Sequence, residues 1–114
     1  APHVNDVWSH KQLINVVSHT DVERSKISEI INKHNFCDVL RYFADEDEKV
    51  YSWWSYRNRD WKKSNRGRRL DHIWITENLL KYYQNHQIFQ TARDFERPSD
   101  HVPISTTIRV SDIT

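Results

Sequence analysis

The sequence predicts an α/β fold in which one long helix precedes a series of short strands. The helix is expected from Asp21 to Asn35, because Ser, Thr and Asp side chains just before and at its start can cap it and isoleucines recur inside it at helical spacing. Runs of strand length, rich in β-branched and aromatic residues, follow at about 50–56, 69–76 and 102–110, with a weaker one near 86–92. A helix and several strands in one short chain indicate an α/β domain.

Shorter elements complete this outline. The first eight residues are expected to form a loop, and a short helix is predicted over roughly residues 9–17. In the long helix, Ile27, Ile30 and Ile31 mark the face that is expected to be buried. Another short helix is predicted over residues 77–83, and Gly67, the only glycine, is expected to mark a tight turn.

The last predicted strand begins behind a rigid loop. Pro98 and Pro103 each lack a backbone N–H and restrict the conformation of the residue before them. They therefore hold the Ser-Asp-His sequence at 99–101 in a fixed tip. From Ile104 to Val110 apolar or β-branched residues alternate with more polar ones, which predicts a strand with one buried face.

Composition indicates one small unit with a thin core. The chain has 114 residues, of which 37% are hydrophobic, and its mean hydropathy is −0.88. A chain of this size buries roughly two thirds of its unfolded surface when it folds alone. Five tryptophans, five tyrosines and four phenylalanines would form a sticky face if a sheet stayed uncovered. We therefore expect a covering partner, either the missing half of a longer protein or a second copy of the chain.

Several functional classes are disfavoured. The single cysteine, Cys37, excludes an internal disulfide and suits a reducing cytoplasm. The seven histidines show neither paired cysteines nor the His-x-x-x-His spacing of a structural zinc site. No apolar run reaches about 18 residues, so neither a membrane span nor an export signal is predicted.

One aspartate and one histidine are candidates for chemistry. Asp71 interrupts an apolar stretch, and an aspartate in a strand is costly to bury unless it is paired. Beside His101, it could orient the imidazole and stabilise its charge, as an acid does behind the catalytic histidine of many hydrolases. A strand-end aspartate that accepts backbone hydrogen bonds explains the same segment equally well.

A basic segment with interleaved aromatic residues is a candidate binding surface. The formal net charge is only +1, yet residues 57–69 hold many Lys and Arg side chains against one acid, Asp60. Tryptophan and tyrosine side chains occur within and just before this segment. The combination suits phosphate contacts beside an aromatic stacking surface. A solvated loop with tryptophan packed beneath it is the alternative.

Three motifs together resemble one protein family. Tyr-Ser-Trp-Trp-Ser-Tyr-Arg occupies positions 51–57, Asn-Arg-Gly-Arg-Arg-Leu-Asp occupies 65–71, and Ser-Asp-His-Val-Pro-Ile occupies 99–104. Their order and spacing resemble those of exonuclease III, the bacterial branch of the abasic-site endonucleases in the endonuclease/exonuclease/phosphatase superfamily. The opening is similar too, with Ala1-Pro2 followed by Asn-Asp-Val-Trp at 5–8.

The resemblance implies a fold and its extent. Residues 1–114 would form the C-terminal half of one DNase I-like domain, a four-layer α/β sandwich of mostly antiparallel sheet with flanking helices. In the family, the metal-binding glutamate, an asparagine, the catalytic tyrosine and the Asp-x-Asn pair lie upstream of the Ala-Pro. No residue of this chain can replace them. We therefore expect a fragment that is incomplete as a stand-alone fold and inactive by itself.

The resemblance also implies roles for the residues near the Ser-Asp-His tip. His101 would contact the phosphate or share in water activation, and Asp71 would orient His101. Asp100 would lie at or near a metal, so Asp100 and His101 are the expected contacts of Mg²⁺ (or Mn²⁺). All three count as expected catalytic residues.

DNA contacts are implied on the two preceding motifs. Trp53 occupies the position of the aromatic residue that lines the abasic-sugar pocket, and Arg68 departs from the bulky aromatic residue found at its position in some relatives. The side chains expected to bind DNA are Trp53, Arg57, Asn65, Arg66 and Arg68.

The implied function is that of a Mg²⁺-dependent DNA-repair nuclease in the bacterial cytoplasm, associated with the nucleoid. It would be a 3′–5′ exodeoxyribonuclease and abasic-site endonuclease that acts on double-stranded DNA with abasic sites or 3′ ends. Two alternatives stay open. A phosphoesterase of the same superfamily that acts on small or lipid phosphates would not need Trp53 and the basic segment. A non-catalytic nucleic-acid-binding module would keep that segment after losing its chemistry.

Overall fold

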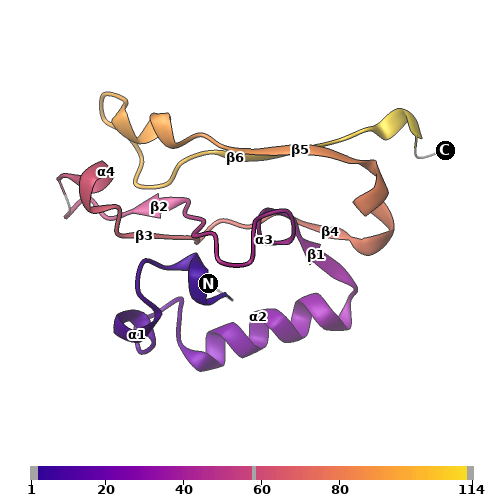
Figure 1. The fold of residues 1–114 in the computed structure, drawn as a ribbon, viewed down its shortest axis with the longest axis horizontal. Helices are drawn as coiled ribbons and strands as arrows, with labels where there is room; N and C mark the ends of the chain where they lie inside the picture. The colour runs from indigo at the N-terminus through magenta and orange to yellow at the C-terminus, as the bar shows by residue number, and fades with distance from the viewer. Residues whose placement is uncertain (1–2, 58, 113–114) are drawn as a thin grey trace.

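The computed structural model describes residues 3–57 and 59–112. Helices and short antiparallel strands alternate along it (Figure 1), as the α/β prediction requires. The elements in chain order are η1 (Val4–Asp6), α1 (His10–Leu13), α2 (Asp21–Lys33), β1 (Phe36–Asp38), α3 (Val39–Tyr42), β2 (Trp53–Trp54), α4 (Trp61–Ser64), β3 (Gly67–Arg68), β4 (Trp74–Thr76), η2 (Glu77–Tyr82), β5 (Tyr83–Ile88), η3 (Gln90–Asp94), β6 (Ile104–Ile108) and η4 (Val110–Asp112).

The strands form antiparallel pairs stacked in tiers. β1 pairs with β4, β2 with β3, and β5 with β6. In Figure 1 the long β5–β6 ribbon lies along one side, β2, β3, β4 and α3 form the middle tier, and α1 and α2 lie on the opposite side. The radius of gyration is 15.2 Å, whereas a compact domain of this length has about 13 Å. The tiers are therefore spread more widely than in a compact domain.

The long helix begins at Asp21 as the sequence predicts, but it ends at Lys33, two residues before the predicted Asn35. The Thr20 side chain accepts a hydrogen bond from the Glu23 amide and donates one to the Glu23 carboxylate, so it caps the first turn. Ile27 and Ile31 are one turn apart and half-buried, as expected for a shared face. The prediction for Ile30 is wrong: its side chain is 45% exposed, because it lies at the edge of that face.

Several predicted strands have different limits. The strand expected over 69–76 is confined to β4, and an extended connection separates β4 from β3. The weak strand expected near 86–92 begins earlier, as β5, and is followed by the 3-10 helix η3. Val110 was expected in the last strand, but it is exposed and begins η4. These segments are fixed by pairing between distant strands, which local pattern does not specify.

The tight turn expected at Gly67 lies two residues earlier. Asn65 has φ 48° and ends α4 in the left-handed conformation, whereas no described glycine has a positive φ. Gly67 is instead required by close packing, because a Cβ there would lie 2.5 Å from the Tyr51 ring. The glycine lets β3 approach the core.

The largest buried cluster lies beneath β2. Tyr51, Trp54, Trp61 and Val102 pack together, and the rings of Trp54 and Trp61 are 5.0 Å apart between centroids. Trp54 is 1% exposed. Trp54 and Trp61 therefore fill the core and do not contribute to an uncovered sheet face.

Candidate active site and nucleic-acid interface

The three sequence motifs become neighbours in one strand arrangement. Trp53 of β2 pairs with Arg68 of β3 on one side and with His101 on the other. The backbone continues this pattern, because the Ser52 amide donates to the Arg68 carbonyl and the Val102 amide donates to the Ser52 carbonyl. β2 therefore holds the basic segment and the Ser-Asp-His tip together.

A chain of hydrogen bonds connects Ser52, Asp71 and His101. The Nδ1 atom of His101 donates to Oδ2 of Asp71 over 2.7 Å, and the Ser52 hydroxyl donates to the same oxygen over 2.7 Å. The Ser52 oxygen in turn accepts hydrogen bonds from the amides of Leu70 and Asp71. The Asp71 carboxylate is thus held from two directions, which fixes the orientation of the imidazole.

The surroundings of Asp71 differ from those predicted. Asp71 was expected inside an apolar strand, but it lies in the connection between β3 and β4 and its side chain is 35% exposed. His101 is 45% exposed. Both groups are held by hydrogen bonds at a surface open to solvent, so the carboxylate does not bear the cost of full burial.

Asp100 is held by the neighbouring aromatic residue. The Trp53 indole N–H donates to Oδ2 of Asp100 over 3.0 Å, and the Asp100 carbonyl accepts from the Trp54 amide. The His101 amide donates to the Ser99 hydroxyl over 3.1 Å. The tip therefore presents Asp100 and His101 in fixed positions on the same edge of β2.

A buried ion network anchors the segment that leads to Asp71. Arg69 is fully buried and donates two hydrogen bonds of 2.8 Å to Asp6 and bonds of 2.7 and 2.6 Å to Asp38. Arg41 also donates to Asp6. Asp6 accepts from Nε and Nη2 of Arg69, and Asp38 accepts from Nη1 and Nη2, so both carboxylates are held in the bidentate geometry of strong pairs.

The ionisation of this network is set by two opposing effects. Burial alone would raise the pKa of the Asp38 carboxyl, but hydrogen bonds and charges from His72 and Arg69 outweigh it and lower the pKa to about 2. Burial likewise opposes ionisation of Asp6, whose pKa is nevertheless lowered by Arg69 and Arg41. The network is fully charged near neutral pH.

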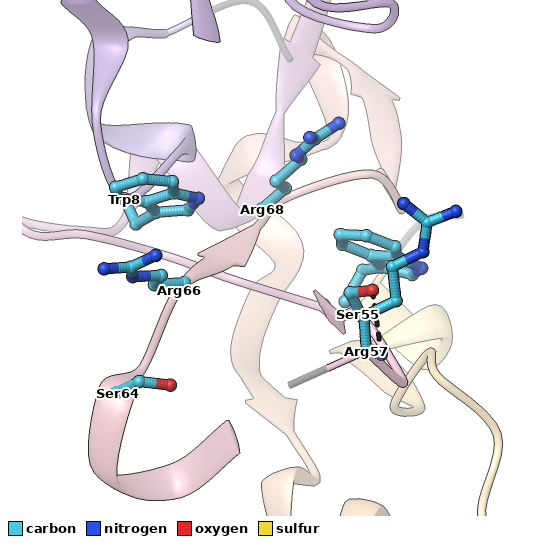
Figure 2. Close-up of a pocket in the computed structure, with 7 residues that line it drawn as sticks. Trp8, Ser55, Arg57, Ser64, Arg66 and Arg68 are labelled. Atoms are coloured by element: carbon cyan, nitrogen blue, oxygen red, sulfur yellow. Dashed lines mark hydrogen bonds between the residues drawn. The ribbon is translucent and has the colours of Figure 1, made fainter. Parts of the chain in front are cut away.

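A pocket opens on the β2–β3 edge next to the tip. Its volume is about 740 Å³, and Figure 2 shows Trp8 and Arg66 at one side and Ser55 and Arg57 at the other, with Arg68 between them. The lining residues are Trp8, Trp53, Ser55, Arg57, Ser64, Arg66 and Arg68. None of these described residues is acidic.

The predicted DNA-binding residues divide into two groups. Trp53, Arg57, Arg66 and Arg68 all line the pocket. Asn65 points elsewhere, because its side-chain oxygen accepts a 3.1 Å hydrogen bond from the buried Trp54 indole. The structure thus assigns Asn65 a packing contact, and its DNA contact stays a prediction.

The sequence did not single out two contributors to the site. Ser52 lies in the Tyr-Ser-Trp-Trp-Ser-Tyr-Arg motif at 51–57, which gives no indication of its role, and its contact with Asp71 spans 19 positions. Trp8 reaches the pocket because its amide donates to the Gly67 carbonyl, which lays the N-terminal segment along β3. A serine next to a tryptophan pair was the only local signal for Ser52.

The described residues do not complete a metal site. Within residues 3–57 and 59–112, no group of three or more His, Cys, Asp or Glu side chains could hold a metal ion. Asp100 and His101 could supply two ligands at most, and one oxygen of Asp100 already accepts from Trp53. Mg²⁺ prefers octahedral oxygen coordination, so the other ligands would have to come from elsewhere.

The chain resembles known enzymes in sequence. It is 39% identical over 67 residues to exodeoxyribonuclease III from Haemophilus influenzae, a match that covers 59% of this chain and 25% of that protein. No family model matches the chain. The chain therefore spans about a quarter of the curated relative it matches.

The likeness extends to solved structures. An AP endonuclease from Archaeoglobus fulgidus superposes with a TM-score of 0.89 at 30% identity, over 96% of this chain and 42% of that one. A 3′ phosphatase from Neisseria bound to product DNA hairpin superposes with a TM-score of 0.84 at 24% identity, over 96% of this chain and 41% of that one. At that identity the second likeness concerns the fold alone.

Two further findings bear on the sequence predictions. None of the described helices is long and apolar enough to cross a membrane. The opening Ala1-Pro2, part of the predicted resemblance, lies outside the described residues.

Sequence and fold together confirm the predicted resemblance: the chain resembles the C-terminal portion of exodeoxyribonuclease III and the AP endonucleases, and it carries part of their α/β fold.

Proposed function

We propose that the chain is the histidine-bearing part of a DNA-repair nuclease that hydrolyses phosphodiester bonds at abasic sites and 3′ ends of double-stranded DNA. The observation that carries the proposal is the Ser52–Asp71–His101 chain of hydrogen bonds, together with the basic and aromatic pocket lined by Trp53, whose backbone pairs with His101. A phosphoesterase for small phosphates would have no use for such a pocket. The similarity to exodeoxyribonuclease III supports the same assignment.

His101 is the group that meets the phosphate. Because Nδ1 donates to Asp71, the neutral ring carries its lone pair on Nε2. That atom can accept a proton from an attacking water, or donate a hydrogen bond to a phosphate oxygen once it is protonated. In either state the Asp71 carboxylate stabilises the charge on the ring, and Ser52 keeps the carboxylate in place.

We propose Mg²⁺ (or Mn²⁺) as the cofactor, with Asp100 and His101 at or near the ion. The remaining ligands would come from an upstream half that completes the fold. When bound, the ion would supply Lewis acidity and charge compensation at the phosphate. The residues of this chain provide the imidazole, the carboxylate of Asp100 and the aromatic contact that orients it.

The assignment has consequences for partners and place of action. The partner of the site is DNA, and the exposed apolar side chains of the chain are covered by the upstream half or by a second copy. A cytoplasmic, nucleoid-associated location is part of the proposal. We use "completed protein" for this chain joined to its upstream half.

A nicking assay tests the function. An end-labelled duplex with a single abasic site is incubated with Mg²⁺ and either the 114-residue chain or the completed protein. The completed protein is expected to cut 5′ to the abasic site, and the chain alone is expected to be inactive. Replacing His101 by Asn should reduce the rate by about 10²–10⁴-fold while DNA binding is retained.

Other outcomes favour the alternatives. Hydrolysis of inositol phosphates without nicking of abasic DNA would identify a small-phosphate phosphoesterase. Tight DNA binding with no cleavage by the completed protein would identify a binding module. Full activity of the chain alone would contradict its assignment as an incomplete fold.

A further inference from the structure

The C-terminal side of the Ser-Asp-His tip is held by β2. The Val102 amide donates to the Ser52 carbonyl, and the Asp100 carbonyl accepts from the Trp54 amide. Backbone hydrogen bonds on both sides of His101 therefore fix it from one direction. Among the described residues, this pairing does not extend to the segment that leads into the tip.

A tyrosine just beyond β2 holds that leading segment. The Tyr56 hydroxyl donates a 2.8 Å hydrogen bond to the Pro98 carbonyl, across 42 positions of the sequence. Tyr56 is 57% exposed, so its hydroxyl does not need a partner within the chain, because water can bond an exposed hydroxyl equally well. The bond instead ties the entry of the tip to the end of β2.

The entry of the tip has an unfavourable backbone conformation. Arg97 has φ 53°, in the left-handed region that a residue with a side chain rarely adopts. A proline also favours an extended conformation in the residue before it, and Pro98 directly follows Arg97. Such a conformation persists where neighbouring contacts hold it, and strained residues of this kind cluster at functional sites. The Tyr56 bond acts on the next residue along the chain.

A buried cation supports the ring of the tyrosine. Arg93 is 6% exposed, and its guanidinium lies 5.1 Å from the Tyr56 ring centre and 5.8 Å from the Trp61 ring centre. Its Nε and Nη2 atoms donate to the Trp54 carbonyl over 3.4 and 3.3 Å, and Nη2 lies 3.5 Å from the Ser55 carbonyl. The cation is thus stabilised by carbonyl oxygens and aromatic faces at the end of β2. It fixes the surface on which the tyrosine ring rests.

We propose that Tyr56 is a positioning residue: its hydrogen bond to Pro98 holds the entry of the tip in the conformation that directs His101 toward the phosphate. Tyr56 itself touches neither the phosphate nor a metal in this role. This inference rests on the proposed function, because it takes His101 as the group that meets the phosphate.

The geometry of the tip explains how a distant hydroxyl affects the imidazole. The His101 amide donates to the Ser99 hydroxyl over 3.1 Å, so a shift of the segment next to Pro98 is passed to the histidine. Without the Tyr56 bond, that segment can relax toward the extended conformation that a proline favours before it. The imidazole then loses its fixed position relative to the substrate, and small displacements of a reacting group strongly reduce the rate.

Single-turnover nicking by the completed protein tests the proposal with Tyr56→Phe. This variant keeps the ring on Arg93 and removes the hydroxyl alone. The rate of cutting the abasic duplex is expected to fall about tenfold, the scale of one lost hydrogen bond. The dissociation constant for the same duplex, measured by fluorescence anisotropy, should change by less than about twofold, because a positioning role does not contribute to binding.

Two comparisons separate this role from a general effect of losing a hydroxyl. Tyr42→Phe is the matched control, because Tyr42 is 61% exposed and lies on α3. It should leave the rate within about twofold. The second comparison makes Tyr56→Phe in the His101→Asn background. There it should slow the reaction by less than about twofold, since a residue that acts through His101 has no imidazole left to position.

Each outcome decides the role of the tyrosine. A rate unchanged by Tyr56→Phe would show that β2 holds the tip without it and would overturn the proposal. Weaker DNA binding with an unchanged rate for bound DNA would make Tyr56 a DNA contact instead. An equal loss in the His101→Asn background would contradict action through His101. If the unaltered completed protein does not nick the duplex, the proposed function fails and the positioning role fails with it.

Discussion

Arg68 and Arg69 are consecutive in the chain and lie in opposite electrostatic surroundings. Arg69 is fully buried between the carboxylates of Asp6 and Asp38, which occupy both edges of its guanidinium. Arg68 is half-buried over the Trp53 ring and has no carboxylate partner among the described residues. Arg68 ends β3 and Arg69 begins the extended connection that follows; successive side chains of an extended backbone point to opposite sides, so one arginine enters the protein and the other enters the pocket.

The surroundings of the two side chains give them different roles. The charge of Arg69 is structural, whereas the charge of Arg68 is accessible to a ligand. The ions of the Arg69 network satisfy one another, and they lock the residues just before Asp71 onto the N-terminal segment. Arg68 instead lines the open pocket together with Arg57 and Arg66. Because both arginines belong to one basic motif, composition alone cannot tell them apart.

The largest expected effect comes from breaking the Arg69 network. Arg69→Met leaves two buried carboxylates without their main partner, which should lower the free energy of unfolding by about 3–5 kcal/mol. Urea denaturation followed by tryptophan fluorescence measures the loss. Arg68→Met is the control and should change stability by less than about 1 kcal/mol. Similar losses in the free energy of unfolding for both variants would show that Arg68 and Arg69 contribute equally to stability, contrary to the expected difference between them.

The pH dependence of stability tests the same network. The pKa of Asp38 is lowered from 3.8 to about 2 in the folded chain, so between these values the unfolded state binds more protons. The stabilisation of about 2 kcal/mol from this group is therefore complete above about pH 5 and is lost as the pH falls toward 2. Urea midpoints measured from pH 6 to pH 2 should show the fall.

A matched pair of variants assigns that pH dependence. Asp38→Asn should make the fall in stability below about pH 5 less steep, since one of the two buried carboxylates whose pKa is lowered is gone and Asp6 remains. Asp45→Asn removes an exposed carboxylate and should leave the profile unchanged. An unaltered profile in Asp38→Asn would show that another group causes the acid sensitivity.

A smaller effect is expected for the hydroxyl that holds Asp71. Ser52→Ala leaves the Leu70 and Asp71 amides without their acceptor and the carboxylate without one donor. We expect a loss of about 1–2 kcal/mol in stability and about tenfold in the nicking rate of the completed protein. Ser52→Thr keeps the hydroxyl and should retain most of the rate. If Ser52→Ala nicks the DNA as fast as the unaltered protein, the Ser52 hydroxyl has no role in the reaction and contributes to packing alone.

Local pattern was enough to predict the elements whose signals lie close together in the chain. The Thr20 cap and the isoleucine spacing predicted α2, and the two prolines around the tip predicted the loop before β6. The three motifs also predicted the family resemblance, since their order and spacing are specific.

Contacts between distant residues were not predictable in the same way. The Arg69–Asp6 pair spans 63 positions and the Ser52–Asp71 contact spans 19. The residue types do not indicate which partner they contact, because an arginine in a basic segment and a serine beside tryptophans are both compatible with an exposed position. Asp71 was expected in a strand for the same reason: the apolar residues around it fit a strand, while the fold uses them in an extended connection.

Asp71 is expected to act through His101, and a double-mutant cycle in the completed protein tests this coupling. Single-turnover nicking rates are measured for Asp71→Asn, His101→Asn and the double variant on the abasic duplex, with DNA affinity measured in parallel. If the two residues act as one unit, the double variant will be no slower than His101→Asn alone. Losses that multiply in the double variant would show that the two side chains act independently, so that Asp71 does not act through His101.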